Sequence, residues 1–256
     1  MSELDTTPLY AMNPVDRFSD RVGDYVKYRP SYPQAAIDRV LEGLSPSQAI
    51  AADIGAGTGI SARLLAEKGV RVIAIEPNAP MRQAAAPHAL VEFRDATAET
   101  TGLADAAVDL VTCFQSFHWF DPESTLLEFH RILNTGGRLA VVWNERDRHD
   151  EFTAEYTRLI KIASDYHPAE QRRMAIEPLL SSSLFGNVQQ YRFAYQQPLD
   201  FDGIVGRAMS TSYIPRAGAA RDRLIADLQQ LYAKNCNDDG FVTLIYTTSV
   251  FLTQTR

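Results

Sequence analysis

The sequence predicts an α/β protein built on a doubly wound, mostly parallel sheet. Up to about residue 145, short apolar runs alternate with segments whose apolar residues recur at helical spacing, a pattern typical of βαβ units. The first apolar run is followed by the glycine-rich turn Gly55-Ala56-Gly57-Thr58-Gly59, which leads into a helix pattern. Glycines allow positive φ angles there and leave room for a ligand beside the free N–H groups of the helix N-terminus. The turn therefore predicts a nucleotide-binding edge, although a plain strand–helix connection has the same pattern.

A second feature strengthens this prediction. The next apolar run ends at Glu76, roughly 20 residues after the first glycine, where an acidic side chain can accept hydrogen bonds from ribose hydroxyls. A dinucleotide-binding turn would carry a small residue at position 60, but this chain has Ile60. The pair of signals thus favours a nucleoside ligand and argues against NAD.

The other elements follow from apolar periodicity and from proline and glycine stops. Strands are expected over residues 48–54, 70–75, 90–93, 108–113, 138–143, 191–195 and 241–252. Helices are expected over 18–29, 33–44, 60–68, 121–133, 152–163, 169–180 and 224–232, with a short one after Pro77. Residues 1–15 are predicted to be a flexible lead-in and 16–256 a single domain, in which helical material over about 147–182 forms a cap above the pocket.

Composition limits the functional classes. The 256 residues are 45% hydrophobic and carry a formal net charge of −7, so the chain offers no basic field for a nucleic acid and small substrates are favoured. No segment approaches the roughly 20 apolar residues of a membrane span, and the start lacks a signal-peptide pattern. Cys113 and Cys236 make no disulfide framework, and the five histidines are scattered. We expect a cytoplasmic monomer or homodimer without a metal site.

Three motifs together resemble the class I S-adenosylmethionine-dependent methyltransferases: the D-x-G-x-G-x-G run from Asp53, the acidic residue Glu76, and the N-T-G-G-R-L segment from Asn134. The segment Tyr25-x-x-Tyr28-Arg29-Pro30-Ser31-Tyr32-Pro33 and the run Phe117-His118-Trp119-Phe120 resemble a small-molecule subgroup that includes trans-aconitate methyltransferase-like proteins. The resemblance covers roughly residues 18–145. It implies a Rossmann-like, seven-stranded sheet with an antiparallel last strand, S-adenosyl-L-methionine as the methyl donor and S-adenosyl-L-homocysteine as the product.

The resemblance and the motifs also imply a set of cofactor-binding residues. In the subgroup the segment around Arg29 covers the cofactor, so Arg29 is a candidate partner for a carboxylate. Many relatives have an Asp-Ala pair where this chain has Thr97-Ala98, so the acidic contact to the adenine amino group either passes to Glu99 or is lost. The expected cofactor-binding residues are Tyr25, Arg29, Asp53, Gly55, Ala56, Gly57, Thr58, Gly59, Glu76, Pro77, Met81, Thr97, Ala98, Glu99 and Gln115.

For the acceptor, we expect a small molecule held by Gln115, His118, Trp119 and Tyr213, with a carboxylate-bearing acid as the leading candidate. Arginines match carboxylates bidentately, and several are expected around the pocket mouth: Arg29, Arg146, Arg148, Arg207 and Arg216. A carboxylate acceptor is already ionised and needs no base, whereas a hydroxyl or an acidic carbon would make His118 a useful general base. Two alternatives stay open, an NAD-dependent oxidoreductase and a non-catalytic S-adenosylmethionine-binding protein.

Overall fold

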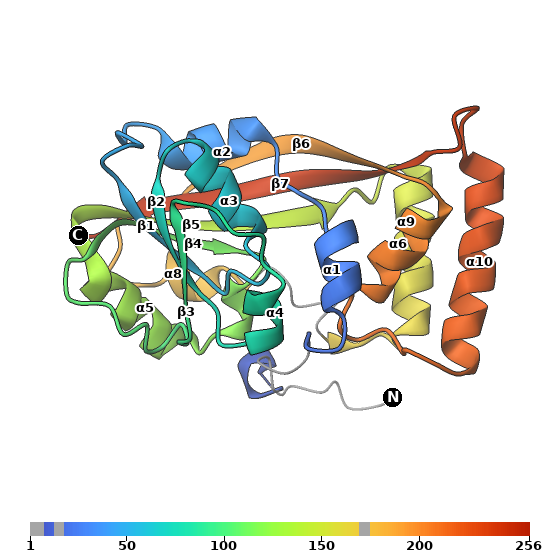
Figure 1. The fold of residues 1–256 in the computed structure, drawn as a ribbon, viewed down its shortest axis with the longest axis horizontal. Coiled ribbons are helices and arrows are strands. Elements are labelled where there is room, and N and C mark those ends of the chain that lie inside the picture. Colours follow the sequence, from blue (N-terminus) through green and yellow to red (C-terminus); the bar gives the residue numbers. More distant parts are fainter. Residues whose placement is uncertain (1–7, 13–17, 169–174) are drawn as a thin grey trace.

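The computed structural model describes residues 8–12, 18–168 and 175–256. Within these residues the strands form one seven-stranded sheet in the order β3-β2-β1-β4-β5-β7-β6 (Figure 1). The strands are β1 (Ile50–Ile54), β2 (Arg71–Ile75), β3 (Val91–Arg94), β4 (Val108–Phe114), β5 (Leu133–Arg146), β6 (Gln189–Leu199) and β7 (Val242–Gln254). Strands β1 to β5 pair in parallel, whereas β7 is antiparallel to both β5 and β6. The predicted seven-stranded sheet with an antiparallel last strand is confirmed.

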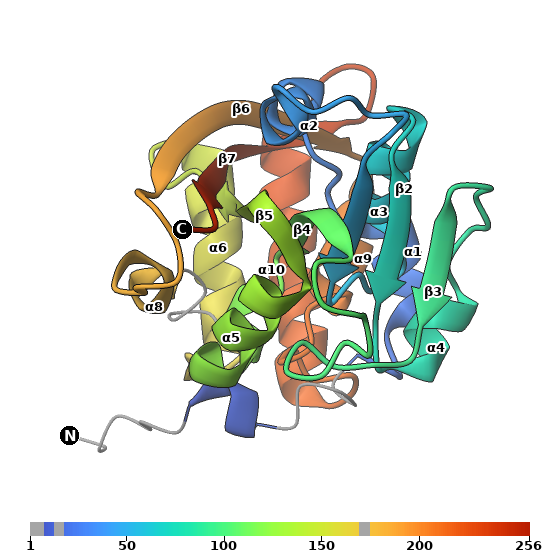
Figure 2. The same cartoon turned by 90° about the vertical axis from the view of Figure 1, so that its left-hand side faces the viewer.

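Helices cover both faces of this sheet (Figure 2). On one face, α2 (Gln34–Leu41) and α3 (Ile60–Glu67) contribute to one apolar cluster with the sheet. On the other face, α5 (Pro122–Ile132) and α8 (Glu177–Leu180) contribute to a second cluster. The central strands β1 and β4 are buried on both faces, as their nearly continuous apolar runs require.

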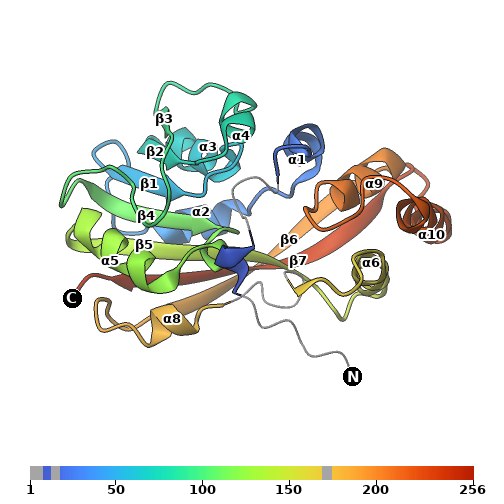
Figure 3. The ribbon, with the colours of Figure 1, turned by 90° about the horizontal axis from the view of Figure 1, so that it is seen from below.

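A third apolar cluster lies beyond the doubly wound part. The long strands β6 and β7 project past the parallel strands, and α6 (Glu151–Ala163), α9 (Phe201–Met209) and α10 (Ala219–Asn235) gather around the projecting ends (Figure 3). The fully buried side chains of Tyr156 and Tyr246 belong to this cluster. None of the helices in the described ranges is long and apolar enough to cross a membrane.

Short elements surround the carboxyl ends of the parallel strands. They are the helices α1 (Val22–Tyr28) and α4 (Ala79–Gln83) and the 3-10 turns η1 (Leu9–Ala11) and η2 (Phe117–Trp119). Helix α1 packs against α9, and η1 packs against η2. Strand β5 begins before the expected residue 138, because it includes the glycine turn that follows α5. The pairing of β5 with β4 shifts in register at this turn, between Val108 and Leu110.

Two predicted segments, the cap over 147–182 and the lead-in over 1–15, differ in the structure from what the sequence suggests. The helical material over 147–182 does not form one unit, because α6 packs on α10 and β7 whereas α8 packs on α5. Residues 169–174 of the helix expected over 169–180 lie outside the described residues. Of the expected lead-in over 1–15, residues 8–12 are described, and Leu9 within them is buried.

Candidate active site

The carboxyl ends of β1, β2, β3 and β4 meet around a cavity of about 130 Å³. Ile54 pairs with Ile75 at the ends of β1 and β2, so the glycine turn and Glu76 emerge side by side, as parallel strands require. Most of the walls are apolar, with a few polar groups among them, an arrangement typical of small-molecule sites. The lining consists of Phe18, Tyr25, Gly55, Gly57, Ile75, Glu76, Pro77, Asn78, Met81, Ala96, Thr97, Ala98, Glu99, Phe114, Gln115, Ser116, Trp119 and Phe120.

The glycine turn leaves room for a ligand at Gly57. This residue has a φ of 59°, and a Cβ added to it would lie 3.3 Å from Met81 Cε and 3.6 Å from the Tyr25 hydroxyl, two cavity-lining side chains. Gly55 has a different role, because its Cβ would lie only 2.6 Å from Ser116 Cβ. Gly57 therefore keeps the cavity open, whereas Gly55 allows the turn to pack closely against the loop after β4.

Glu76 stands at the tip of β2 with its carboxylate in the cavity wall. One oxygen accepts a hydrogen bond of 2.8 Å from the Gly57 N–H, and the other accepts one of 2.9 Å from the Asn78 N–H. Burial raises the pKa of Glu76, although these two hydrogen bonds favour the ionised form. A carboxylate held in this way still has lone pairs for two neighbouring ligand hydroxyls, which fits the ribose predicted to bind there.

The loop after β3 contributes Thr97, Ala98 and Glu99 to the cavity wall. The Glu99 carboxylate accepts a hydrogen bond of 3.1 Å from the Asp121 N–H at the start of α5. Glu99 is therefore both a cavity residue and a link between this loop and α5. Asn78 also lines the cavity, and it caps α4 by accepting a hydrogen bond of 2.9 Å from the Met81 N–H.

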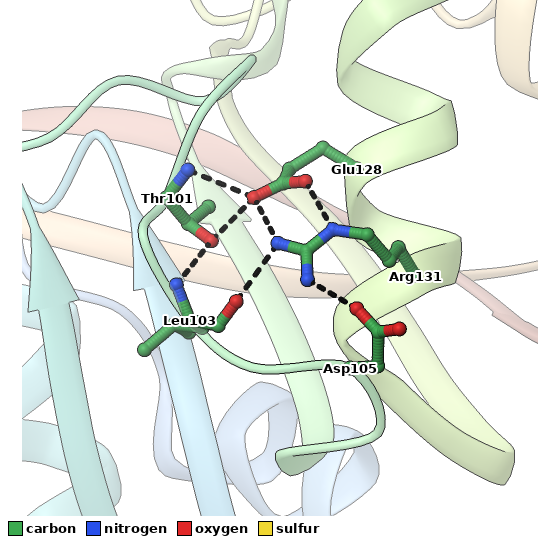
Figure 4. Close-up of polar contacts among 5 residues, drawn as sticks. All are labelled: Thr101, Leu103, Asp105, Glu128 and Arg131. Carbon is green, nitrogen blue, oxygen red and sulfur yellow. Dashed lines mark hydrogen bonds and ion pairs between the residues drawn. The ribbon is translucent and has the colours of Figure 1, made fainter.

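The same loop is fixed to α5 by a network that runs from the buried Thr101 and Glu128 to the exposed Asp105 (Figure 4). Glu128 accepts hydrogen bonds from the Thr101 N–H at 2.8 Å and the Thr101 hydroxyl at 2.6 Å. Arg131 donates to Glu128, to the Leu103 carbonyl at 2.9 Å and to Asp105 at 2.6 Å. Burial opposes ionisation of Glu128, but the hydrogen bonds from Arg131 and Thr101 outweigh it and lower the pKa of Glu128. The loop that lines the cavity is thus anchored a few residues after Glu99.

A smaller cavity of about 30 Å³ adjoins the first and contains Arg29 in its lining. The Arg29 guanidinium lies 4.7 Å from the centre of the Tyr25 ring, and its Nη2 donates to the Ser210 carbonyl at 2.8 Å. Its Nε is buried and has no hydrogen-bond partner. Burial, reinforced by the charge of Arg207, lowers the pKa of Arg29 to about 10. An unpaired donor on a desolvated guanidinium fits an incoming carboxylate. Both cavities share Tyr25, Gly55, Phe114 and Gln115.

Gln115 lines both cavities and has an unusual backbone conformation. Its φ is 57°, a left-handed conformation that costs a non-glycine residue roughly 1–3 kcal/mol and that is concentrated at functional sites. The backbone N–H donates to the Val142 carbonyl at 2.9 Å, and the side-chain amide donates to the Asn144 carbonyl at 3.0 Å. These two hydrogen bonds to β5 hold Gln115 in the conformation that places it in both walls.

Three predicted cofactor-binding residues do not line either cavity: Asp53, Thr58 and Gly59. Asp53 is fully buried and accepts hydrogen bonds from the Ser61 hydroxyl at 2.6 Å and the Thr112 hydroxyl at 2.7 Å. It therefore joins β1, α3 and β4 beneath the turn instead of facing the ligand. Ala56, by contrast, lines the smaller cavity.

The four predicted acceptor residues are also divided. Gln115 and Trp119 line the larger cavity, but His118 and Tyr213 do not. His118 Nδ1 accepts a hydrogen bond of 3.3 Å from Trp143 Nε1, and Tyr213 stacks on His167 with 5.2 Å between ring centres. The shared role of His118 and Tyr213 with Gln115 in acceptor binding therefore stays a prediction, since only Gln115 and Trp119 of the four line the larger cavity.

The cavity also contains residues that the sequence analysis did not assign to it. Ser116 donates to the Ile54 carbonyl at 2.7 Å, and Asn78 and Phe18 come from segments without a recognisable motif. Only the position of Asn78 directly after Glu76-Pro77 could have indicated it. Among the described residues, no three His, Cys, Asp or Glu side chains are grouped so that they could hold a metal ion.

Comparison with known proteins identifies the family. Residues 52–141 match the family described as a methyltransferase domain. An uncharacterized methyltransferase of Mycobacterium tuberculosis is 33% identical over 238 residues, which are 90% of this chain and 92% of that protein. A putative type II methyltransferase from Anaeromyxobacter dehalogenans has a similar structure, with a TM-score of 0.65 and 25% identity over 90% of this chain and 98% of that one.

A more distant enzyme shares the fold alone. A phosphoethanolamine N-methyltransferase of Haemonchus contortus, solved in complex with S-adenosyl-L-methionine, has a TM-score of 0.56 and 15% identity over 98% of this chain and 60% of that one. The family is shown by the match to the Mycobacterium tuberculosis methyltransferase, which has a similar length and aligns with nine-tenths of the sequence. The chain belongs to the methyltransferase family.

Proposed function

We propose that the protein transfers a methyl group from S-adenosyl-L-methionine to a small-molecule acceptor, and that a carboxylate-bearing acid is the leading acceptor. The observation that carries this proposal is the placement of Glu76 in the larger cavity and of Arg29 in the adjoining one, with Gly57 leaving space beside Tyr25. An anion and a cation in adjoining cavities suit a ligand with hydroxyls at one end and a carboxylate at the other.

Each part of the cofactor has a set of residues that would hold it. Glu76 would accept hydrogen bonds from the ribose hydroxyls, and Arg29 would bind the carboxylate of the amino-acid portion. The adenine would lie among Met81, Ala98 and Glu99, where a flexible thioether and an anchored loop form the walls. Family membership disfavours the alternative of an NAD-dependent oxidoreductase, as does Ile60 at the end of the turn.

The bound sulfonium supplies an activated methyl group. The protein then has to align the acceptor in line with that group and exclude water. Phe18, Tyr25 and Trp119 form an aromatic wall that can exclude water, because the Phe18 ring lies 5.8 Å from Tyr25 and 6.2 Å from Trp119, edge to face. An acidic acceptor is ionised at neutral pH and needs no base, which agrees with the absence of His118 from the lining of the larger cavity.

Isothermal titration with S-adenosyl-L-methionine, S-adenosyl-L-homocysteine and NAD tests the cofactor. We expect binding of the first two and none of NAD. Tight binding of NAD, or failure of both sulfur ligands to bind, would contradict the proposal.

Turnover on a panel of small acids and phenols tests the acceptor and separates an enzyme from a non-catalytic binding protein. With an acid, His118→Asn should keep most of kcat, and the rate should not follow a histidine titration. Activity confined to phenols, with a collapse of kcat in His118→Asn and unchanged cofactor affinity, would overturn the carboxylate assignment.

A further inference from the structure

The region around α9 holds a buried arginine that no acidic side chain neutralises. Arg207 is 4% exposed, and its Nε donates to the Tyr246 hydroxyl at 3.2 Å while Nη1 lies 3.4 Å from the Ser210 hydroxyl. Among the described residues, neither Arg207 nor Arg29 takes part in an ion pair. Buried charges in proteins are normally paired, so a bound anion would be stabilised beside these two arginines.

One edge of the Arg207 guanidinium is available to such an anion. Its Nη2 has no hydrogen-bond acceptor among the described residues. This nitrogen is also not fully enclosed by protein atoms. Two parallel N–H bonds from a guanidinium edge match the two oxygens of a carboxylate.

Tyr156, on α6, supplies a second unsatisfied donor. Its side chain is fully buried, and its hydroxyl has no hydrogen-bond partner. Burial raises the pKa of Tyr156 to about 12, although the charges of Arg207 and Arg146 act in the opposite direction. The hydroxyl therefore keeps its proton at neutral pH and can donate to an anion. A buried hydroxyl without a partner destabilises a protein, so its presence calls for a reason other than stability.

These groups adjoin the proposed methyl-transfer region through Ser210. The Ser210 carbonyl accepts the hydrogen bond from Arg29, and its hydroxyl lies beside Arg207. Both arginines therefore contact Ser210. Because Arg29 lines the smaller cavity and is assigned to the cofactor carboxylate, Arg207 is left for a second anion.

We propose that Arg207, Tyr156 and Tyr246 form a binding site for the carboxylate of the acceptor, distinct from the site at Arg29. This inference rests on the proposed function, since it names the part of the protein that recognises the acceptor. The site takes the acid group of a small organic acid, desolvates it and holds it beside the cofactor cavity. It differs from the predicted acceptor site around His118 and Tyr213, neither of which it includes.

The test uses protein saturated with S-adenosyl-L-homocysteine and two acids, sodium succinate and sodium benzoate, with the neutral amides succinamide and benzamide as controls. Thermal unfolding and isothermal titration are measured for each. At least one acid should raise Tm and bind to the wild type, and neither amide should, because an amide lacks the charge that pairs with Arg207. Arg207→Gln should abolish the effect, whereas Arg223→Gln, which removes an exposed arginine on α10, should behave as the wild type.

Tyr156→Phe gives the sharpest result, because it removes only the unpartnered hydroxyl. The free variant should have a Tm equal to or above that of the wild type, yet bind the acid about tenfold more weakly, the change expected for losing one hydrogen bond to a charged group. A merely structural hydroxyl would not give this combination.

Three results would overturn the inference: no binding of either acid to the wild type, equal binding to Arg207→Gln, or unchanged acid binding in Tyr156→Phe. The cofactor is measured separately. Failure of S-adenosyl-L-homocysteine to bind would refute the proposed function, whereas normal cofactor binding without acid binding would refute only the site at Arg207.

Discussion

The two candidate sites are formed in different ways. One lies in the cofactor half of the sheet, and the other lies in the region around α6, α9 and α10. In the first, the ligand space depends on backbone conformation and on residues at strand ends, such as Gly57 and Glu76. In the second, side chains from distant segments converge, as Arg207 and Tyr246 do over 39 residues of sequence. The first kind of site is local in sequence and the second is not, so substitutions in the two regions should affect different ligands.

Gly57→Val should have the largest effect on the cofactor half. Its φ of 59° strains a β-branched residue, and the added side chain would enter the space beside Met81 and Tyr25. We expect loss of S-adenosyl-L-homocysteine binding by more than about a hundredfold. Gly43→Val is the matched control, because Gly43 has a φ of 78° with nothing within 4 Å of an added Cβ. Both variants should lose some stability; equal cofactor affinities in the two would show that Gly57 does not border the ligand.

Asp53 should give this half a distinctive pH dependence of stability. Burial raises the pKa of Asp53 to about 6, against the hydrogen bonds from Ser61 and Thr112, whereas an unfolded chain has a value of about 3.9. The folded state therefore keeps the proton to higher pH. The resulting stabilisation is complete below about pH 4 and is lost as pH rises through 6, by roughly 3 kcal/mol in total.

Denaturant unfolding of the wild type and Asp53→Asn between pH 4 and 8 measures this contribution. The free energy of unfolding of the wild type should fall relative to the variant as pH rises to about 6 and stay level above about 7. A difference that is constant across this range would mean that Asp53 is already ionised at low pH in the folded protein.

Glu76→Ala should weaken binding of S-adenosyl-L-homocysteine by roughly ten- to a hundredfold, corresponding to the 1.5–3 kcal/mol typical of a hydrogen bond to a charged group. Acid binding at the Arg207 site should not change when the cofactor is kept saturating. Glu92→Gln, at an exposed glutamate on the neighbouring strand β3, should leave both affinities unaltered. Unchanged cofactor affinity in Glu76→Ala would refute the ribose assignment.

Arg131→Leu should have the smallest effect, because Arg131 acts through the loop that carries Glu99. We expect S-adenosyl-L-homocysteine to bind severalfold more weakly as the loop loses its anchor to α5, with a modest loss of stability. Arg158→Leu removes a comparable arginine paired with Glu155 three residues earlier on α6 and should leave cofactor affinity unchanged. Calorimetric titration of both variants would show whether the network in Figure 4 positions the loop or only stabilises α5.

The contrast between the two regions also explains what the sequence could predict. The glycine turn, Glu76 and the strands follow from local patterns, and the structure places Gly57 and Glu76 at one cavity. Asp53 belongs to the same motif, yet its side chain points inward because Ser61 and Thr112 offer it hydrogen bonds. Which face a polar side chain takes at a strand end depends on neighbours from other elements, and no local pattern encodes them.

Prediction was weakest where long-range packing decides. Arg207 is one of five arginines that the sequence predicts around the pocket mouth, and nothing in the sequence distinguishes it from Arg216, which is partly exposed and pairs with Asp20. Tyr156 looked like an ordinary core residue of an amphipathic helix. Only the packing of α6, α9 and β7 brings it to Arg207 and Tyr246.

In the proposed arrangement, a cofactor with an amino-acid tail binds between Glu76 and Arg29. The most direct test titrates the wild type and Arg29→Gln with S-adenosyl-L-homocysteine and with methylthioadenosine, which lacks the carboxylate. The wild type should prefer S-adenosyl-L-homocysteine, and Arg29→Gln should lose that preference, by about tenfold or more, while its affinity for methylthioadenosine stays the same. Equal weakening of both ligands, or an unchanged preference in Arg29→Gln, would contradict this placement of the cofactor.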